Sequence, residues 1–257
     1  MPIKPATALR RLGLLGAIGA LVLVASTLPP RAEEGARPAH VNQAFPHLHH
    51  SPHASQTWSG YAVTGDKPYT SISGSWSVPP LNCAKGSGFV SPWIGIDGWA
   101  NETVEQIGVD YDCMGGKASY HTWVEMYPAN SIYFTETVKA GDVLAAKVTV
   151  SGSSWVLTES DYAERWTKTF HKTASAAKAS AEAILEDLGN SPPAPYVDDF
   201  RVENFRNLQA SGKAFAAAGT AHKTSLKRAS TLLSKESALS KQSGQSKSEF
   251  SITWLHR

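Results

Sequence analysis

The sequence predicts an all-β fold in which antiparallel strands form a two-sheet sandwich or a barrel. From Thr57 onward, short runs rich in Val, Ile, Thr, Trp and Tyr recur at intervals of roughly ten residues, and Gly, Pro, Asn and Asp separate them. No convincing helical pattern interrupts these runs. Residues 57–257 contain no repeat of fixed period and no linker, so we expect a single domain there.

The expected strands follow one another closely along the chain. They are TWSGYAVTG (57–65), SISGSWSVPP (71–80), GFVSPWIGIDG (88–98), TVEQIGVDY (103–111), SYHTWVEMYP (119–128), SIYFTETV (131–138), DVLAAKVTVSG (142–152), SWVLTES (154–160), ERWTKTFHKT (164–173), AEAILEDL (181–188), DDFRVENFRNL (198–208) and EFSITWLHR (249–257). On propensity alone, residues 175–188 also fit an Ala-rich helix. The Ser- and Lys-rich residues 223–248 predict a long loop or an irregular hairpin.

Residues 1–32 predict a secretory signal peptide. Lys4, Arg10 and Arg11 precede an apolar run of 13 residues, 12–24. This run is short for a membrane span and no stop-transfer charges follow it, so a membrane anchor is the weaker interpretation. We therefore expect a secreted or periplasmic protein with no stable membrane association after cleavage.

Residues 33–56 predict a flexible pro-segment or linker, because they are rich in Pro and His and lack apolar periodicity. Five of the nine His residues lie in this stretch. Clustered His gain charge as the pH falls through about 6.5, so the segment could respond to pH. A solvated tail with incidental His is the simpler interpretation.

The charge of the exported part argues against nucleic acid as a partner. Four of the 24 basic residues lie within residues 1–32, which hold no acid, and the other 20 stand against all 22 acidic residues, a net charge of −2. This balance offers no basic surface for a phosphate backbone. We expect a monomer with no nucleic-acid partner.

Two cysteines, Cys83 and Cys113, lie in the exported part. An even pair outside the cytosol is typical of a disulfide. No CxxC or HExxH pattern is present, so the sequence predicts no metal site and no cofactor.

Three of the expected strands each combine an aliphatic face with a face of aromatic and polar side chains. Residues two apart in a strand share a face. The second faces carry Trp93, Gly95, Asp97, Gln106, Gly108, Asp110, His121, Trp123, Glu125 and Tyr127. If the strands are neighbours, these faces combine into an aromatic groove with a few polar groups, which is typical of a site for an extended peptide or glycan. For any single residue, a solvated face or a turn is the alternative.

Seven motifs occur in an order that resembles one family. They are WSGYAV (58–63), GSWSVPP (74–80), SPWIGIDG (91–98), VEQIGVDY (104–111), YHTWVEMYP (120–128), AEAILEDL (181–188) and FSITW (250–254). Together they resemble the glutamic peptidases, or eqolisins, and more closely a bacterial-type member than a fungal one. The resemblance implies a lectin-like (concanavalin-like) sandwich of two large sheets. It also implies an endopeptidase that acts on protein or peptide substrates at acidic pH and needs neither a metal nor a covalent intermediate.

The resemblance implies roles for individual residues. The family's catalytic Gln corresponds to Gln106, and the Glu of its AExIxED motif corresponds to Glu186. The residues implied to support or line the cleft are Trp93, Asp97, Asp110 and Glu125, and the aromatic face adds Trp123 and Tyr127. The family motif has a Trp where this chain has Ala183, which predicts a wider pocket beside Glu186.

A Gln and a Glu suffice for peptide hydrolysis. Glu186 takes a proton from water and later gives it to the leaving nitrogen. The amide N–H of Gln106 cannot ionise, so it stabilises the oxyanion at any acidic pH while its carbonyl oxygen positions the water. Neighbouring carboxylates raise one another's proton affinity, which predicts an acidic working range.

Two other functions fit the same groove. A sandwich-type glycoside hydrolase would use Glu125 and Glu186 as its pair of carboxyl groups, with Gln106 binding only a sugar hydroxyl. A lectin-like module would bind a ligand there without catalysis.

Overall fold

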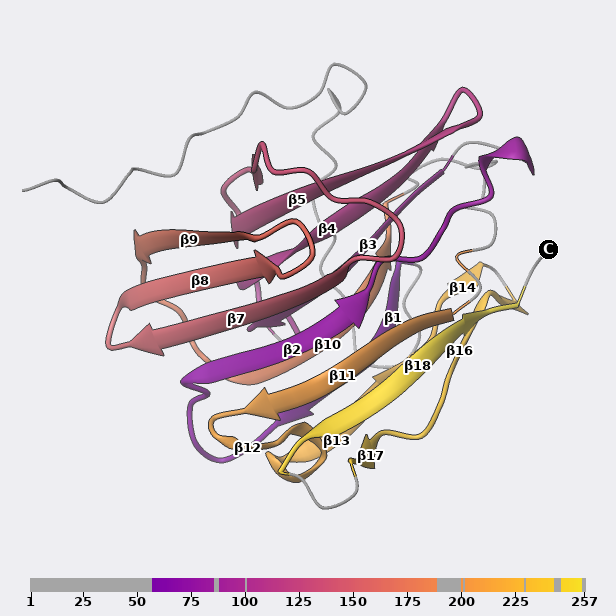
Figure 1. The fold of residues 1–257 in the computed structure, drawn as a ribbon. Coiled ribbons are helices and arrows are strands. Elements are labelled where there is room, and N and C mark those ends of the chain that lie inside the picture. The colour runs from indigo at the N-terminus through magenta and orange to yellow at the C-terminus, as the bar shows by residue number, and fades with distance from the viewer. Residues whose placement is uncertain are drawn as a thin grey trace, which may run out of the picture. The chain divides into compact units, whose positions relative to one another are not determined.

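The computed structural model describes residues 57–85, 88–99, 101–188, 200, 202–228, 230–242 and 246–255. Most of them lie in two antiparallel β-sheets that pack face to face (Figure 1). This arrangement confirms the predicted two-sheet sandwich. The expected signal peptide and pro-segment, residues 1–56, lie outside the described residues, and the domain boundary at residue 57 remains a prediction.

The first sheet has seven strands. Their spatial order is β13 (Thr220–Thr224), β1 (Trp58–Thr64), β10 (Ser180–Asp187), β3 (Gly88–Ile96), β4 (Val104–Met114), β5 (Lys117–Tyr127) and β6 (Ile132–Tyr133). The strands β3, β4 and β5 are neighbours, as the predicted shared face requires. Strand β10 lies on the other side of β3, although it follows β5 in the chain by more than 50 residues.

The second sheet has nine strands. Seven of them follow one another in the order β16 (Ser234–Glu236), β18 (Ser248–Trp254), β11 (Val202–Ala210), β2 (Ser71–Ser77), β7 (Val143–Ser151), β8 (Ser154–Asp161) and β9 (Trp166–Thr173). The other two are short: β12 (Lys213–Ala214) pairs with β11, and β17 (Ser240–Lys241) pairs with β18. A separate ribbon joins β14 (Lys227–Arg228) to β15 (Thr231–Leu232), and two 3-10 turns, η2 (Cys83–Lys85) and η3 (Phe215–Ala217), complete the described part. The short strands β14 to β17 match the irregular hairpin expected over residues 223–248.

The Ala-rich segment that also fitted a helix is a strand in the structure. Strand β10 lies between β1 and β3 and is buried along almost its whole length. Its Ala181, Ala183 and Leu185 face the core between the sheets, whereas Ile184 joins the apolar cluster on the opposite face. Burial on both faces outweighs the helix propensity of Ala in this position.

The core between the sheets is rich in aromatic side chains. The second sheet contributes Trp76, Trp155, Phe205 and Phe250, of which the first two are almost fully buried. The rings of Phe205 and Phe250 stack with their centroids 5.1 Å apart, and Trp76 lies against Phe205 at 5.9 Å. Such pairs add about 0.5–1.5 kcal/mol each beyond the area that they bury.

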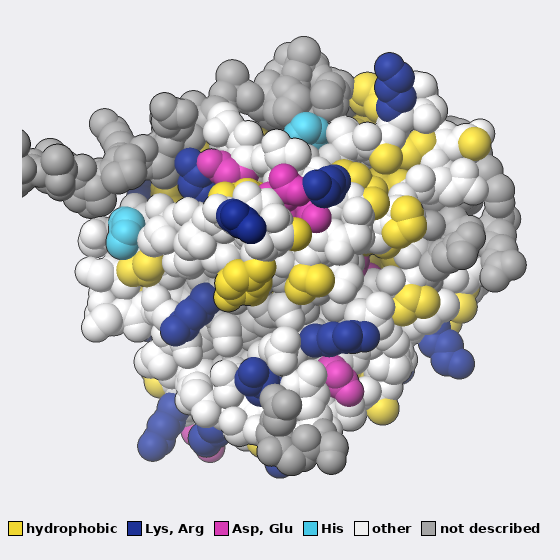
Figure 2. All heavy atoms as spheres, viewed as in Figure 1, with side chains coloured by type: hydrophobic (Ala, Val, Ile, Leu, Met, Phe, Trp, Pro, Cys, Tyr) yellow, Lys and Arg dark blue, Asp and Glu magenta, His cyan; other side chains and the backbone are white. Residues whose placement is uncertain are grey.

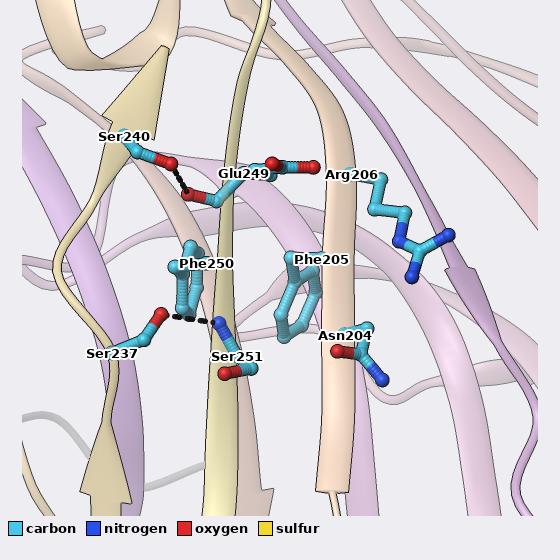
Figure 3. A pocket seen from close by; sticks show the side chains of 8 residues that line it. All are labelled: Asn204, Phe205, Arg206, Ser237, Ser240, Glu249, Phe250 and Ser251. Carbon is cyan, nitrogen blue, oxygen red and sulfur yellow. Dashed lines mark hydrogen bonds between the residues drawn. The ribbon is translucent and has the colours of Figure 1, made fainter. Parts of the chain in front are cut away.

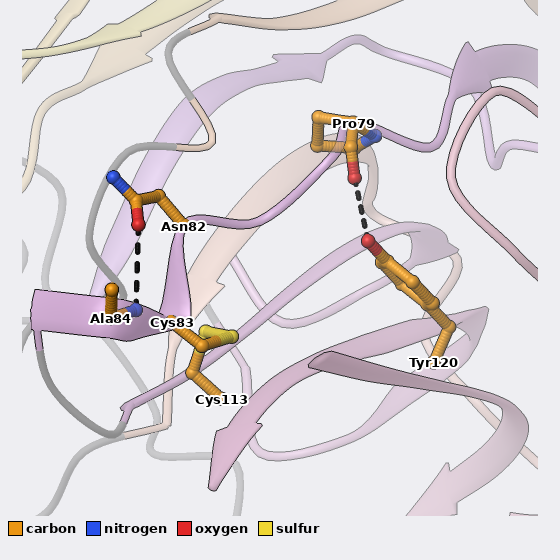
Figure 4. The surroundings of a disulfide bond; sticks show 6 residues. All are labelled: Pro79, Asn82, Cys83, Ala84, Cys113 and Tyr120. Carbon is orange, nitrogen blue, oxygen red and sulfur yellow. Dashed lines mark hydrogen bonds between the residues drawn. A yellow bond between two sulfur atoms is a disulfide. The ribbon is translucent and has the colours of Figure 1, made fainter. Parts of the chain in front are cut away.

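The disulfide predicted between Cys83 and Cys113 is present (Figure 4). It joins the turn η2 to the end of β4, with the two Cα atoms 5.2 Å apart. Close by, the Tyr120 hydroxyl donates a hydrogen bond of 2.8 Å to the Pro79 carbonyl (Figure 4). The disulfide and this hydrogen bond together fix the connection between the two sheets from β2 to β3.

The exposed face of the second sheet is nearest the viewer in Figure 2. Its Lys and Arg side chains are spread over this face, and some of them lie beside Asp or Glu side chains (Figure 2). Lys168 on β9 pairs with Glu136 at 2.6 Å. Among the described residues, no helix is long and apolar enough to cross a membrane.

Several carboxyl groups point into the space between the sheets. Glu203 is fully buried, accepts a hydrogen bond of 3.0 Å from the Tyr111 hydroxyl, and has its pKa raised by burial to about 8. Burial also raises the pKa of Glu159 well above its ordinary value, and the nearby Asp161 raises it further. These groups are therefore protonated in the folded protein at pH values where an unfolded chain has already lost the proton.

We predict that the fold is most stable in acid and loses stability as the pH rises from about 4.5 to about 8. In this range the native state binds more protons than the unfolded state, so each such group lowers the free energy of unfolding by up to about 1.4 kcal/mol per pH unit. Glu203→Gln should reduce this slope, because a Gln there stays neutral at every pH. Urea unfolding at several pH values measures it, with Asp66→Asn on an exposed bend as the control. A slope unchanged by Glu203→Gln would contradict this account.

Candidate active site

The outer face of the first sheet, turned away from the second sheet, carries the candidate site residues. Its apolar cluster consists of Trp58, Ala62, Trp93, Trp99, Val104, Trp123, Tyr133 and Ile184, with Tyr127 packed against it. Trp58 and Trp93 meet edge to face with their ring centroids 5.1 Å apart. The aromatic face predicted for three strands is therefore one continuous surface, which β1 and β10 extend.

Strand pairing arranges the polar residues of this face in rows across the sheet. One row runs from Glu182 on β10 through Gly95 on β3 and Gln106 on β4 to Glu125 on β5. We call it the Gln106 row. Residues that face each other on neighbouring strands point to the same side of the sheet, so Glu182 and Gln106 lie on either side of Gly95. Because Gly95 has no side chain, Gln106 and the Trp93 ring approach the β3 backbone closely at this position, where a Cβ atom would lie 3.1 Å and 3.2 Å from them.

Gln106 is fully buried, and of its two amide atoms only Nε2 forms a hydrogen bond within the described structure. Its Nε2 atom donates a hydrogen bond of 2.6 Å to Oε2 of Glu125, whose Oε1 atom accepts one of 2.9 Å from the Ser131 hydroxyl. No group among the described residues donates a hydrogen bond to Oε1 of Gln106. Ser131 and Glu125 thus set the orientation of the Gln106 amide, and its carbonyl oxygen is left to bind another donor, such as water.

Glu182 is fully buried, and within the described structure neither of its carboxyl oxygens forms a hydrogen bond of normal geometry. Burial raises the pKa of this carboxyl well above its ordinary value. The Ser180 side chain and the Trp99 backbone lie close enough to lower that pKa in part, while Asp97 and Glu105 raise it. A buried carboxyl with a raised pKa, opposite an amide, has the properties of an acid–base group.

Glu186 lies elsewhere on the same face. It pairs with Trp58 and Ser91, and its Oε2 atom accepts a hydrogen bond of 3.0 Å from Nε1 of Trp93. It is four residues along β10 from Glu182, a distance of roughly 13 Å in an extended strand. We expected Glu186 to act together with Gln106, but the residue of β10 in the same row as Gln106 is Glu182.

Asp97 does not line the site but holds the chain segment that leads into β10. This residue has a left-handed backbone conformation, with φ 70°. Its carboxylate accepts hydrogen bonds from the backbone N–H groups of Lys178 at 2.6 Å and Ala179 at 2.7 Å, and from the Asn101 amide at 2.7 Å. These bonds fix the chain where it enters β10, and hence the position of Glu182 a few residues later.

The other predicted residues lie on the face as expected. Asp110 accepts a hydrogen bond of 2.6 Å from the Tyr133 hydroxyl, and Nε1 of Trp123 donates one of 2.9 Å to the Ser91 hydroxyl. Ser91 donates in turn to the Val109 carbonyl at 3.1 Å. These contacts hold the aromatic rings in fixed positions.

Ala183 is on the opposite side of β10 from the site. It belongs to the core between the sheets and pairs with Tyr61 and Ile94. The Trp of the family motif would therefore face the core, so the predicted widening of the pocket beside Glu186 is wrong. The alternation of β10 itself carried this information, because Ala183 has the opposite parity to both Glu182 and Glu186.

Sequence reasoning missed three features of this face. It assigned the acidic role to Glu186 and gave none to Glu182, because the choice between them depends on pairing between distant segments. It gave no role to Ser131 or Tyr133, whose hydrogen bonds depend on the turn between β5 and β6. It also left out His222, which reaches this face from β13.

A hollow of about 220 Å³ lies on the second sheet, between β11, β18 and the segment before β17 (Figure 3). It is lined by Asn204, Phe205, Arg206, Ser237, Ser240, Glu249, Phe250 and Ser251. The Ser237 side chain accepts a hydrogen bond of 2.9 Å from the Ser251 backbone N–H at its edge (Figure 3). None of the predicted site residues lies here. Among the described residues, no group of three or more His, Cys, Asp or Glu side chains could hold a metal ion.

Comparisons with known proteins agree with this fold. Three solved structures share the fold. Scytalido-glutamic peptidase with a peptide-based transition state analogue is 20% identical with a TM-score of 0.62, and the eqolisin SCP-B in complex with the tripeptide Ala-Ile-His is 18% identical with a TM-score of 0.58; each match covers 78% of this chain and 98% of the other. Aspergilloglutamic peptidase from Aspergillus niger is 23% identical with a TM-score of 0.52, and the match covers 65% of this chain and 99% of the other. No curated protein sequence matches the chain. The sequence matches the Peptidase A4 family over residues 56–254. Because this match extends from the first described strand to the last, the chain belongs to the Peptidase A4 family, the glutamic peptidases or eqolisins.

Proposed function

We propose that this chain is an endopeptidase that hydrolyses peptide bonds with Gln106 and Glu182 on either side of a water molecule. The observation that carries the proposal is the Gln106 row, in which the two side chains flank a glycine on a buried aromatic face. The family to which the chain belongs supports the reaction class. The register supports Glu182, rather than Glu186, as the acidic partner.

The reaction needs no group beyond these two side chains and water. Ionised Glu182 takes a proton from the water as its oxygen attacks the carbonyl carbon of the substrate, and the electron pair of the C=O bond moves to the oxygen. An N–H of Gln106 stabilises that oxyanion, a contribution of about 3–4 kcal/mol for a single donor in comparable enzymes. Glu182 then gives its proton to the nitrogen as the C–N bond breaks.

The environment of Glu182 suits both of its roles. A carboxyl whose pKa is raised by burial is a stronger base when ionised than an ordinary carboxylate, and it holds the proton that the leaving nitrogen needs. The carboxyl groups between the sheets keep their protons in acid, which stabilises the fold there. The raised pKa of Glu182 means that only its ionised fraction can take the proton from water at low pH, so this fraction limits the first step.

A glycoside hydrolase that uses Glu125 and Glu186 is not supported. These residues lie on β5 and β10, three strand spacings apart, which is roughly 14 Å across the sheet, and in different rows. Carboxyl pairs in glycoside hydrolases are about 5–10 Å apart. The Glu125 carboxyl is also engaged by Gln106 and Ser131.

Export and a monomeric state remain part of the proposal. A disulfide between Cys83 and Cys113 is typical of an oxidising compartment, which fits a secreted or periplasmic enzyme. The composition of residues 1–32 supports the same location.

Single substitutions test whether Glu182 or Glu186 is the catalytic carboxyl group. Glu182→Gln and Gln106→Ala should each lower kcat/KM on an unfolded protein substrate at acidic pH by about 10²–10⁴-fold, the range typical of an acid–base group or an oxyanion donor. Glu186→Gln should lower it by only about tenfold or less, because Glu186 contacts Trp93 rather than the reacting atoms.

The same three variants distinguish the alternatives. Loss of activity in Glu186→Gln with full activity in Glu182→Gln would restore the original assignment. If the wild-type protein binds unfolded chains without cleaving them, the chain is a binding module. Far-UV circular dichroism and the thermal midpoint at the assay pH serve as the folding control.

Gly95→Ala tests the space between the pair. A Cβ atom there would lie 3.1 Å from Cβ of Gln106 and 3.2 Å from Cζ3 of Trp93, so it would push the Gln106 side chain away from the position that the proposed mechanism needs. We expect kcat to fall by at least about tenfold while the fold is retained. Gly65→Ala, in which the nearest atom is the Tyr69 hydroxyl at 3.3 Å, is the matched control away from this face. Equal activity of the two variants would argue against a water above Gly95.

A further inference from the structure

The Gln106 row continues beyond Glu182 to the edge of the sheet. Glu182 faces Ala62 on β1, and Ala62 faces His222 on the edge strand β13. Facing residues point to the same side of a sheet, so His222 shares the outer face with the proposed catalytic pair. Because Ala62 is small, it places no bulky side chain between Glu182 and His222.

Trp99 connects His222 with Glu182. Its ring stacks on the His222 imidazole, with ring centroids 5.4 Å apart and an angle of 28° between the planes. Its backbone lies beside the Glu182 carboxyl and lowers the pKa of that group in part. Trp99 itself is buried within the apolar cluster of the outer face. One residue therefore contacts both the acid and the imidazole.

Only one of the two ring nitrogens of His222, Nε2, has a hydrogen-bond partner within the described structure. Its Nε2 atom lies 2.8 Å from the Thr64 hydroxyl, and the stacking on Trp99 fixes the ring plane. No hydrogen bond within the described part of the chain involves its Nδ1 atom. The residue is half-buried, whereas Ala62 and Glu182 are fully buried. His222 is thus the partly exposed end of the Gln106 row, and its Nδ1 atom can form a hydrogen bond with a ligand.

We propose that His222 and Trp99 form a subsite that binds a carboxylate of the substrate close to the scissile bond. This inference rests on the proposed function. The carboxylate can come from an Asp or Glu side chain or from the C-terminus of the peptide. His222 is two strand spacings from Glu182, roughly 10 Å, and an extended peptide advances about 3.3 Å per residue, so the bound group belongs to one of the three residues on either side of the cleaved bond.

The charges around His222 favour this ligand. At acidic pH a histidine carries a positive charge and both ring nitrogens donate hydrogen bonds. On the same face, β1 contributes only uncharged residues, namely Trp58, Gly60, Ala62 and Thr64. The turn η3, which also packs against β13, contains no charged residue either. Lys223 has the opposite parity and is exposed on the other side of β13. Glu182, with its raised pKa, is the acidic group that faces His222 along the row.

Paired substrates test the subsite. Quenched fluorescent peptides carry Asp or Asn at each of the three positions on either side of the cleaved bond, and a further pair has a free or an amidated C-terminus. At pH 5, where Asp is ionised, we expect the wild-type enzyme to prefer the carboxylate at one position by about fivefold to tenfold in kcat/KM, as for a partly exposed charge-assisted hydrogen bond. His222→Ala should bring this ratio close to one.

Two further variants refine the result. His222→Gln keeps an N–H donor without the charge and should retain an intermediate ratio. His171→Ala, on the exposed strand β9 of the second sheet, is the matched control and should leave the ratio as in the wild type. A ratio that His222→Ala does not change, or an equal loss of turnover on both peptides, would overturn the subsite, because the residue would then act only on the fold or on Glu182.

A binding measurement separates this inference from the proposed reaction. Calorimetry at pH 5 compares the Asp and Asn peptides on Glu182→Gln and on the double variant Glu182→Gln/His222→Ala. Tighter binding of the Asp peptide that depends on His222 supports the subsite even if the wild-type protein hydrolyses nothing. Absence of such a difference overturns the subsite even if hydrolysis is confirmed.

Discussion

The pairing of β10 with β3, and of β3 with β4, is the constraint on which the site depends. It brings Glu182 to the same level as Gln106, although the two residues are 76 positions apart in the chain. A shift of one residue would turn Glu182 into the core and replace it with an alanine, because side chains alternate between the faces. Asp97 protects this register, since its carboxylate binds the two backbone N–H groups just before β10.

Much of the fold could be predicted from the sequence, since it depends on local patterns. Alternation of apolar and polar residues identified the strands, and the order of motifs identified the family. The choice between Glu182 and Glu186 could not be made in this way. Both have the same parity on β10, so alternation treats them alike, and only the long-range register sets one opposite Gln106. The helix alternative for residues 175–188 failed for a related reason, because burial between two neighbouring strands overrides local propensity.

The acids between the sheets and those on the outer face of the first sheet have different surroundings. Between the sheets, Glu203 on β11 of the second sheet has a partner in Tyr111 on β4 and keeps its proton up to about pH 8, so it costs the fold little in acid. On the outer face, Glu182 has no hydrogen bond of normal geometry within the described structure, which leaves its proton for transfer. Burial raises the pKa of both groups. Glu159, between the sheets, also lacks a hydrogen-bond partner within the described structure. The position of Glu182 opposite Gln106 on the outer face, rather than burial or the lack of a partner, therefore distinguishes it from the acids of the core.

The neutrality of the amide suits Gln106 to this environment. A second carboxyl in its place, two strands from Glu182, would carry a charge that changes with pH. A Gln holds its donor at every pH, and Glu125 with Ser131 fixes its orientation without charging it. In the proposed reaction, Glu182 is the one ionisable group and Gln106 the neutral donor, so a change of pH alters the state of the base without removing the group that stabilises the oxyanion. A sheet with many buried acids would in this way use only one of them in the reaction.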